Sequence, residues 1–273
     1  MKKLVRFLLL IGGLFFAGVY LLPIYVLIVN SFKTQKGIYF NVLSFPSENF
    51  FTWGNYPEAI ERLGFFKALF NSLAISVSAT LLIIAFTSMA AWALVRYKSK
   101  ISSGLFYLFA AAMLVPFQCV MLPLVSLMGK LGLLNPPGLV FMYLGFGSSL
   151  SIILYHGFIK NIPVELEEAA TIDGCGVFRL FWVIVFPLLK TITITVAILN
   201  IMWIYNDFLL PMLTINRPEW QTLPLKTFLF FGQFSKRWDL ATAGLILSMI
   251  PIILFYLSAQ KYIVKGVTEG AIK

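Results

Sequence analysis

Six apolar runs, each long enough to cross a lipid bilayer, constrain the fold of this chain more than any other feature. A transmembrane helix needs about 20 consecutive apolar residues. The runs occupy residues 7–29, 69–95, 105–128, 138–158, 188–213 and 240–262. The chain is 60% hydrophobic and only 12% charged, which is typical of a protein surrounded by lipid. The sequence predicts an all-α membrane protein with six transmembrane helices, forming a single domain over residues 1–273.

The first apolar run follows Lys2, Lys3 and Arg6, a pattern shared by cleaved signal peptides and by first transmembrane helices. The run is longer than the apolar core of a signal peptide, which has roughly 7 to 15 residues. We therefore favour a retained first helix.

The positive charges of the chain separate its loops into two sets. A net charge of +10 also raises the question of a nucleic-acid partner, but the cations are separated by apolar runs rather than gathered on one face, which argues against it. Basic residues are densest beside both termini, in the short loop 96–100 and in the loop after the fourth run. Because cytoplasmic loops carry the excess of Lys and Arg, both termini are predicted to be cytoplasmic.

Two loops on the opposite side, at about 31–68 and 214–239, are long and rich in aromatic residues. Trp and Tyr favour the membrane interface whatever their function. Exposed aromatic side chains also anchor contacts with partner proteins. The loops are therefore either interfacial packing or a docking surface for an external partner, and the sequence leaves both open.

The most acidic stretch of the chain, EEAATIDGCG at 167–176, lies in the predicted cytoplasmic loop 160–187. Pro163 is suited to a helix start, and the acids that follow are favoured in the first turns by the helix dipole. Gly174 and Gly176 can both adopt the positive φ that ends a helix. The stretch predicts a short helix, a glycine turn and a second helix.

The expected helix has features of a contact surface. Ala169, Ala170 and Gly174 present small side chains that allow close approach, and the acids Glu168 and Asp173 can pair with Arg or Lys of a partner. An interfacial hairpin that merely joins two spans explains the same residues, because amphipathic surface helices are common.

The same stretch resembles the EAA loop of ABC importer permeases, whose pattern is E-A-A-x3-G-x9-I-x-L-P. The matching residues are Glu168, Ala169, Ala170, Gly174, Ile184 and Pro187, and Phe186 stands where the pattern has Leu. The resemblance runs over nearly the whole chain and narrows to the second permease of the carbohydrate-uptake subfamily, of the maltose and multiple-sugar type. It includes NSFKT at 30–34, WGNY at 53–56, FNSL at 70–73, AWALVRYK at 91–98, VPFQCVMLPL at 115–124 and the ending from residue 260. Tyr205 departs from the subfamily, which usually has Trp-Asn-Asp there.

The resemblance implies the type I ABC importer permease fold in a bacterial inner membrane and ATP-driven import of a sugar or oligosaccharide. It also implies four partners: a second permease subunit, two ATPase subunits and an external solute-binding protein. The sequence has no G-x-x-x-x-G-K-[ST] phosphate loop, so the chain is not expected to be an enzyme, and ATP and Mg are expected on the ATPase. The resemblance implies that this ATPase is contacted by the coupling residues, which are Glu168, Ala169, Ala170, Asp173 and Gly174.

Polar and aromatic side chains inside the spans are candidates for the solute pathway, because polar groups are costly in lipid and usually face a cavity or another helix. The candidates are Gln118, Asn200, Trp203, Tyr205, Asn206 and Asp207, with Asn71 a weaker one. Asn and Gln equally often tie helices together, and aromatic rings often only pack. His156 is expected to be a hydrogen-bonded helix residue rather than a proton relay. No metal site or disulfide is expected from Cys119 and Cys175.

Four other functions fit parts of this pattern. An importer permease for a solute other than a sugar shares the EAA loop. A proton-coupled carrier needs embedded acids or histidines, of which the spans offer few. An intramembrane enzyme needs a motif such as H-E-x-x-H or G-x-S-x-G, and neither is present. A structural membrane subunit without transport activity is not excluded by the sequence.

Overall fold

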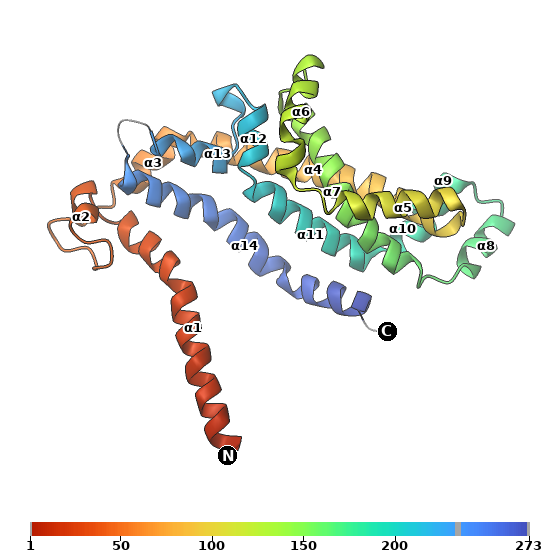
Figure 1. Cartoon of the computed structure of the whole chain (residues 1–273), viewed down its shortest axis with the longest axis horizontal. Helices are drawn as coiled ribbons and strands as arrows, with labels where there is room; N and C mark the ends of the chain where they lie inside the picture. Colours follow the sequence, from red (N-terminus) through yellow and green to blue (C-terminus); the bar gives the residue numbers. More distant parts are fainter. Residues whose placement is uncertain (1, 233–235, 272–273) are drawn as a thin grey trace. The chain divides into compact units, whose positions relative to one another are not determined.

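The described part of the chain is built almost entirely from helices (Figure 1). The computed structural model describes the backbone of residues 2–232 and 236–271 and the side chains of residues 6–7, 9–232 and 236–261. The chain divides into two compact units. One comprises Met1–Leu69 and Leu223–Pro251, and the other Phe70–Thr222 and Ile252–Lys273. Each unit has an apolar core of its own.

The first unit contains the N-terminal helix, several short helices and the start of the last helix. Its elements are α1 (Lys2–Ser31), α2 (Gln35–Phe40), α3 (Asn55–Leu63), α13 (Leu223–Thr227), the 3-10 turn η3 (Phe228–Phe230) and the first part of α14 (Trp238–Ala271). Its core is formed where Leu63, Leu223 and Leu240, all fully buried, meet Phe230. Gly64, with a φ of 55°, ends α3 in the left-handed conformation that favours glycine, and α4 begins directly after it.

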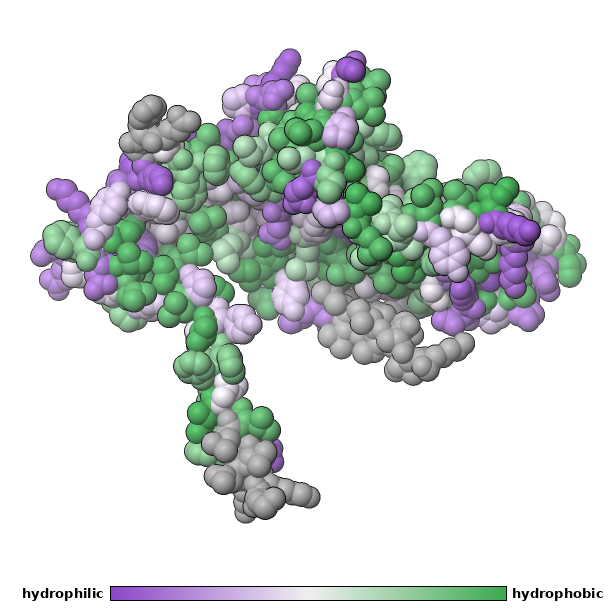
Figure 2. Space-filling model, in the orientation of Figure 1, coloured by the Kyte–Doolittle hydropathy of each residue, from purple (hydrophilic) through white to green (hydrophobic). Residues whose placement is uncertain are grey.

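Helix α1 is the least covered helix of the first unit. No residue is buried within the chain in the most apolar 18-residue stretch of its candidate span Leu9–Ser31, and burial begins only at Val29. Figure 2 shows mostly hydrophobic side chains along its described surface. Since a large apolar surface is unstable in water, this helix requires lipid or another protein around it.

The second unit contains most of the long helices. Its elements are α4 (Phe65–Arg96, from Phe70), α5 (Lys100–Ala112), α6 (Phe117–Lys130), α7 (Pro136–Ile159), α8 (Glu165–Ile172), α9 (Val177–Arg179), the π-helix η1 (Leu180–Val185), α10 (Phe186–Leu188), α11 (Lys190–Asn206), α12 (Leu209–Thr214), the 3-10 turn η2 (Pro218–Trp220) and the end of α14.

Helix α7 is central to this unit and packs against α5 and α11. Its buried residues belong to two apolar clusters. Tyr143 lies with Ile83 and Leu139 in one cluster, and Tyr155 lies with Ile159 and Phe181 in the other. The second cluster joins the helices to the segment that contains α8 to α10, because Phe181 comes from that segment.

Four helices are long and apolar enough to cross a membrane: Leu9–Ser31 of α1, α4, α7 and Trp238–Lys261 of α14. Two bent helix pairs meet the same criterion, so the count reaches six if each pair forms one span. The first pair covers the third apolar run, and the second joins Val177–Leu188, which ends where the fifth run begins, to α11 within that run. The fold is that of an all-helical, multi-span membrane protein.

The third run does not form one continuous helix. Helix α5 ends at Ala112 and α6 begins at Phe117, with an angle of 103° between them. Pro116 precedes α6, lacks a backbone N–H, and disfavours helical geometry at Val115. The apolar composition of the run hides this break, since hydropathy carries no information on chain direction.

The fifth run is interrupted as well. The axis of α11 lies at 81° to that of the preceding helical segment, Val177–Leu188. Helix α11 then ends at Asn206. Asp207 is extended, and its Oδ1 accepts a hydrogen bond from the N–H of Leu209 at 3.0 Å. This local side-chain contact competes with helix continuation and starts the separate helix α12.

Candidate functional site

The segment from residue 160 to residue 187 forms the hairpin that the sequence predicts: α8, a turn, and the helices α9 to α10 with a π-helical insertion. Three acids occupy the first turn of α8, where the helix dipole favours negative charge. At the other end, the N–H of Gly174 bonds the carbonyl of Thr171 and the N–H of Cys175 bonds that of Ala170, both at 3.0 Å. This pair of bonds is a Schellman motif.

The turn depends on one glycine rather than two. Gly174 has a φ of 79°, as predicted, which is the left-handed conformation that other residues adopt at a cost. Gly176 has a φ of −68° and lies directly before α9, so the prediction of a positive φ there was wrong. A single left-handed residue already completes the Schellman motif, and the chain is extended again at Gly176.

Four of the five predicted coupling residues, Glu168, Ala169, Asp173 and Gly174, are exposed. Ala170 is only 7% exposed and packs in the apolar cluster with Ile159 and Phe181, so it does not share their surface. The reason is helical spacing: Ala170 lies three residues after Glu167, whose side chain also faces inward.

Glu167 is the residue that sequence reasoning placed among the acids without assigning it a role. Its Oε1 lies 2.7 Å from Nη2 of Arg96 and accepts a hydrogen bond from Nε of Arg96 at 2.8 Å. Its Oε2 accepts one from Nε1 of Trp92 at 2.9 Å. Arg96 also donates to the carbonyl of Ile162 at 3.0 Å. These contacts fasten the hairpin to the end of α4.

A signal for this joint is present in the sequence. Trp92 and Arg96 are four residues apart at the end of an apolar run, so they lie on one face of a helix and present two donors together. The sequence does not show that the acceptor for both donors is Glu167, which lies more than 70 residues further along the chain. The buried carboxylate has both oxygens satisfied, which is the condition for a charge to remain in an apolar environment.

The outer surface of the hairpin combines apolar and acidic side chains. Ile172 is 86% exposed and Phe178 71%, and both come from the same segment as Glu168 and Asp173. Exposed apolar side chains next to charges are typical of protein contact surfaces. In Figure 2 hydrophilic side chains gather around α8, at the right of the view. The arrangement suits a partner with an apolar cleft edged by basic residues.

A second group of candidate residues gathers at the end of α11. The hydroxyl of Tyr143 donates to Oδ2 of Asp207 at 2.8 Å, and the ring of Trp203 meets that of Tyr143 edge to face at 5.5 Å. Trp203 is 43% exposed and lines an open apolar cavity with Phe117 and Met142. Tyr143 was not among the predicted residues, because one tyrosine in an apolar run does not stand out.

The other predicted pathway residues differ in their exposure. Asn200 is buried and donates to Oγ of Ser151 at 3.1 Å, so it ties α11 to α7. Tyr205 is 2% exposed, whereas Asn206 and Gln118 are exposed.

Two further residues, Asn71 and His156, were considered in the sequence as possible functional groups. Asn71 donates to the carbonyls of Glu219 and Gln221 and holds that loop. His156 is buried and stacks on Phe106 at 4.0 Å. No group of three or more His, Cys, Asp or Glu side chains that could hold a metal ion occurs in the part of the chain where side chains are described.

The aromatic loop of the first unit is organised by polar contacts. Lys33 is 1% exposed, and its Nζ donates to Oδ1 of Asn30 at 3.2 Å and to the carbonyl of Asn41 at 2.8 Å. Asn55 donates to the carbonyls of Ser31 and Lys33, both at 2.8 Å. Burial lowers the pKa of Lys33 below its ordinary value of 10.5. The loop is therefore an ordered element rather than a loose connection.

The sequence matches known membrane transport proteins. Residues 83–269, more than half of the chain, match the family described as "Binding-protein-dependent transport system inner membrane component". The probable starch degradation products transport system permease protein AmyC of Thermoanaerobacterium thermosulfurigenes is 47% identical over 98% of this chain and 97% of its own length. The multiple sugar-binding transport system permease protein MsmG of Streptococcus mutans is 35% identical over 97% and 95%. The melibiose/raffinose/stachyose import permease protein MelC of Bacillus subtilis is 34% identical over 94% and 93%.

The fold matches a solved transporter as well. A chain in the crystal structure of a bacterial ABC transporter involved in the import of the acidic polysaccharide alginate superimposes with a TM-score of 0.80. The match covers 96% of this chain and 97% of that chain at 21% sequence identity. At this identity the likeness concerns the fold.

Proposed function

The chain belongs to the family of binding-protein-dependent transport system inner membrane components, and from this premise we propose that it is the permease subunit of an ATP-driven importer for a sugar or oligosaccharide. The observation that carries the substrate class is the agreement among relatives. Three permeases that align with nearly the whole chain are each named for the transport of saccharides or starch products.

The importer requires several partners besides this chain. We assign it a second permease subunit, two ATPase subunits that bind ATP and Mg, and an external solute-binding protein. The chain has no phosphate loop of its own, so the energy comes from the ATPase. With the hairpin on the cytoplasmic side, both termini are cytoplasmic, in agreement with the positive charge of loop 96–100.

The hairpin is the coupling element of this proposal. Glu168, Ala169 and Asp173 on its outer surface contact the ATPase, with Gly174 forming the turn, and the exposed side chain of Ile172 fills an apolar cleft. Movement of the ATPase displaces the hairpin, and the contacts of Glu167 with α4 transmit that displacement to the transmembrane helices. Rigid-body motion of this kind alternates access between the two sides of the membrane.

The solute pathway is assigned to the group at the end of α11. The exposed face of Trp203 stacks on a pyranose ring, and Asp207, held by the buried hydroxyl of Tyr143, offers its carboxylate to sugar hydroxyls. Asn206 and Gln118 are exposed and available for further contacts. Asn200 and Tyr205 support the packing of α11 from within and do not contact the solute.

Reconstitution tests the function directly. The chain is incorporated into vesicles with its ATPase subunits and second permease, and ATP hydrolysis is measured with binding protein loaded with an oligosaccharide, a monosaccharide, an amino acid or a peptide. Stimulation by a saccharide together with its uptake is the expected result. Stimulation only by a peptide or an amino acid would reject the substrate class, and a stable complex without ATPase subunits would reject the importer.

A further inference from the structure

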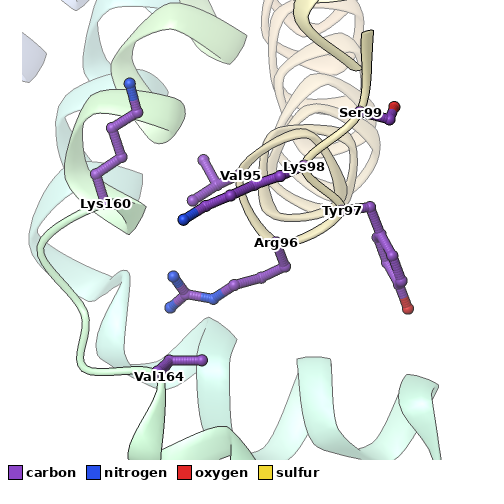
Figure 3. A pocket seen from close by; sticks show the side chains of 7 residues that line it. All are labelled: Val95, Arg96, Tyr97, Lys98, Ser99, Lys160 and Val164. Carbon is purple, nitrogen blue, oxygen red and sulfur yellow. The ribbon is translucent and has the colours of Figure 1, made fainter. Parts of the chain in front are cut away.

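A basic groove lies where α4 ends and the chain leaves α7. Val95, Arg96 and Lys98 line it from α4 and its end, and Lys160 and Val164 line it from the segment before α8 (Figure 3). An adjoining recess of about 240 Å³ shares three of these residues and continues along α5. Figure 3 shows Arg96 and Lys98 extending across the gap between the two segments, whereas Tyr97 points away from it.

The groove carries two positive charges that no described carboxylate neutralises. The guanidinium of Arg96 is paired with Glu167 at 2.7 Å. Neither Lys98 nor Lys160 pairs with a carboxylate among the described side chains, and both are exposed. Both lysines line the groove, and two cations beside one groove create a positive potential that selects an anion.

The groove lies at the edge of the membrane, and the apolar side chains of Val95 and Val164 line it beside the cations. Helices α4 and α7 are candidate spans, and both end at the groove, so it lies at the depth of the lipid headgroups. The recess continues past Phe106 and Tyr107 of α5, a helix in which no residue is buried. A ligand with an anionic head and an apolar tail covers both kinds of surface, whereas a small soluble anion leaves the apolar walls exposed.

We propose that this groove binds the phosphate headgroup of an anionic phospholipid, with Lys98 and Lys160 contacting the phosphate and the walls along α5 covering acyl chain. Basic pockets between transmembrane helices are a general means of binding anionic headgroups. The lipid lies beside Arg96 and therefore beside the joint between α4 and the hairpin. Only its assignment to the cytoplasmic leaflet rests on the proposed function; the binding itself does not.

The test measures lipid binding to the purified complex, with this chain and its co-purifying subunits in neutral detergent. Phosphatidylglycerol, phosphatidylcholine and inorganic phosphate are titrated separately, and bound lipid or anion is counted by native mass spectrometry. Phosphatidylglycerol is expected to bind in preference to the other two. The double variant K98Q/K160Q is expected to bind phosphatidylglycerol roughly 30-fold more weakly. Each lysine near an anionic lipid raises the affinity about fivefold, and the two factors multiply.

The matched control is K100Q/K130Q, which removes the same charge from two exposed lysines that do not line the groove. It is expected to bind phosphatidylglycerol as the unmodified complex does. An equal loss in both double variants would assign the effect to diffuse surface charge and overturn the proposal. Binding of inorganic phosphate as tightly as the lipid would also overturn it.

Amine labelling distinguishes a lipid from a protein that covers the groove. After delipidation of the intact complex, Lys98 and Lys160 are expected to react with an amine reagent and to become protected when phosphatidylglycerol is added. Protection without lipid would show that a partner subunit occupies the groove. None of these measurements uses transport, so specific lipid binding in a complex that imports no sugar leaves this proposal intact and rejects only the proposed function.

Discussion

Glu167 and Glu168 are neighbours in the sequence, yet they face different surroundings. Glu167 is buried against Arg96 and Trp92, whereas Glu168 is exposed on the outer surface of α8. One carboxylate holds the hairpin to the membrane helices, and the other is available to a partner. Substitution of each by glutamine, which keeps the shape and removes the charge, therefore separates a structural from a contact role.

The E167Q variant is expected to lose about 3 kcal/mol of unfolding free energy, because it leaves the charge of Arg96 buried without a partner. E168Q, an exposed control one residue away, is expected to remain within about 0.5 kcal/mol of the original chain. Chemical unfolding in detergent measures both. Equal stability of E167Q and E168Q would contradict a supporting role for the buried pair.

The two glycines of the turn give a second matched comparison. G174A places an L-residue at a φ of 79°, which costs about 1 kcal/mol, whereas G176A is tolerated at a φ of −68°. Neither added methyl group meets another atom within 4 Å, so the difference isolates backbone strain. Amide exchange of α8 is expected to be about fivefold faster in G174A and unchanged in G176A. Unchanged exchange in G174A would show that the turn does not stabilise the helix.

At the scale of elements, the segment between α1 and α3 depends on Lys33. Its amine is held by Asn30 and by the carbonyl of Asn41, and Asn55 binds the backbone on either side of Phe32. A buried amine stabilises this segment through hydrogen bonds, but its charge is costly there. The stability of the segment is therefore expected to vary with pH.

Burial lowers the pKa of Lys33 in the folded state, so the unfolded chain holds this proton more tightly. The free energy of unfolding is therefore expected to rise with pH as the pH approaches 10.5 from below. In K33M this contribution is absent, and the slope of stability against pH is smaller. K36M, which removes an exposed lysine nearby, is the control and retains the original slope. Identical slopes in K33M and the unmodified chain would rule out the contribution of Lys33.

The elements of this protein differ in how far the sequence predicts them. Uninterrupted apolar runs predict α4 and α7, since hydropathy and length decide a transmembrane helix. The turn at Gly174 follows from local chemistry in the same way. The bend of 103° between α5 and α6 cannot be predicted in this way, because the apolar residues on either side of Pro116 have the same composition in a straight helix and in a bent one.

Long-range pairing is the other limit of prediction. The partners Trp92 and Glu167 are 75 residues apart, and Tyr143 and Asp207 are 64 residues apart. Each residue by itself has several explanations, and only the packing of the helices against one another selects one. Polar residues in the spans were therefore predicted as candidates, while their division into helix ties and exposed groups required the structure.

At the scale of the whole molecule, much of the surface is apolar and cannot face water. Large hydrophobic side chains are exposed on α1, α4, α5 and α14 alike. In a membrane these surfaces meet lipid or another protein, so the polar and half-exposed groups that remain are the ones available for solute. Trp203 is the most exposed aromatic residue in the group at the end of α11.

Substitution of Trp203 tests whether this group lies on the route of the solute. In the reconstituted importer, W203A is expected to raise the half-saturating concentration of loaded binding protein or to lower the uptake rate by about fivefold, the equivalent of about 1 kcal/mol for one lost aromatic contact. Stimulated ATP hydrolysis is expected to continue, because the hairpin is unchanged. N200A is the control: it removes a helix tie between α11 and α7 and is expected to lower stability while leaving the preference among sugars as before. If N200A alters sugar preference and W203A does not, the solute passes along the buried face of α11, and the roles assigned to these two residues are reversed.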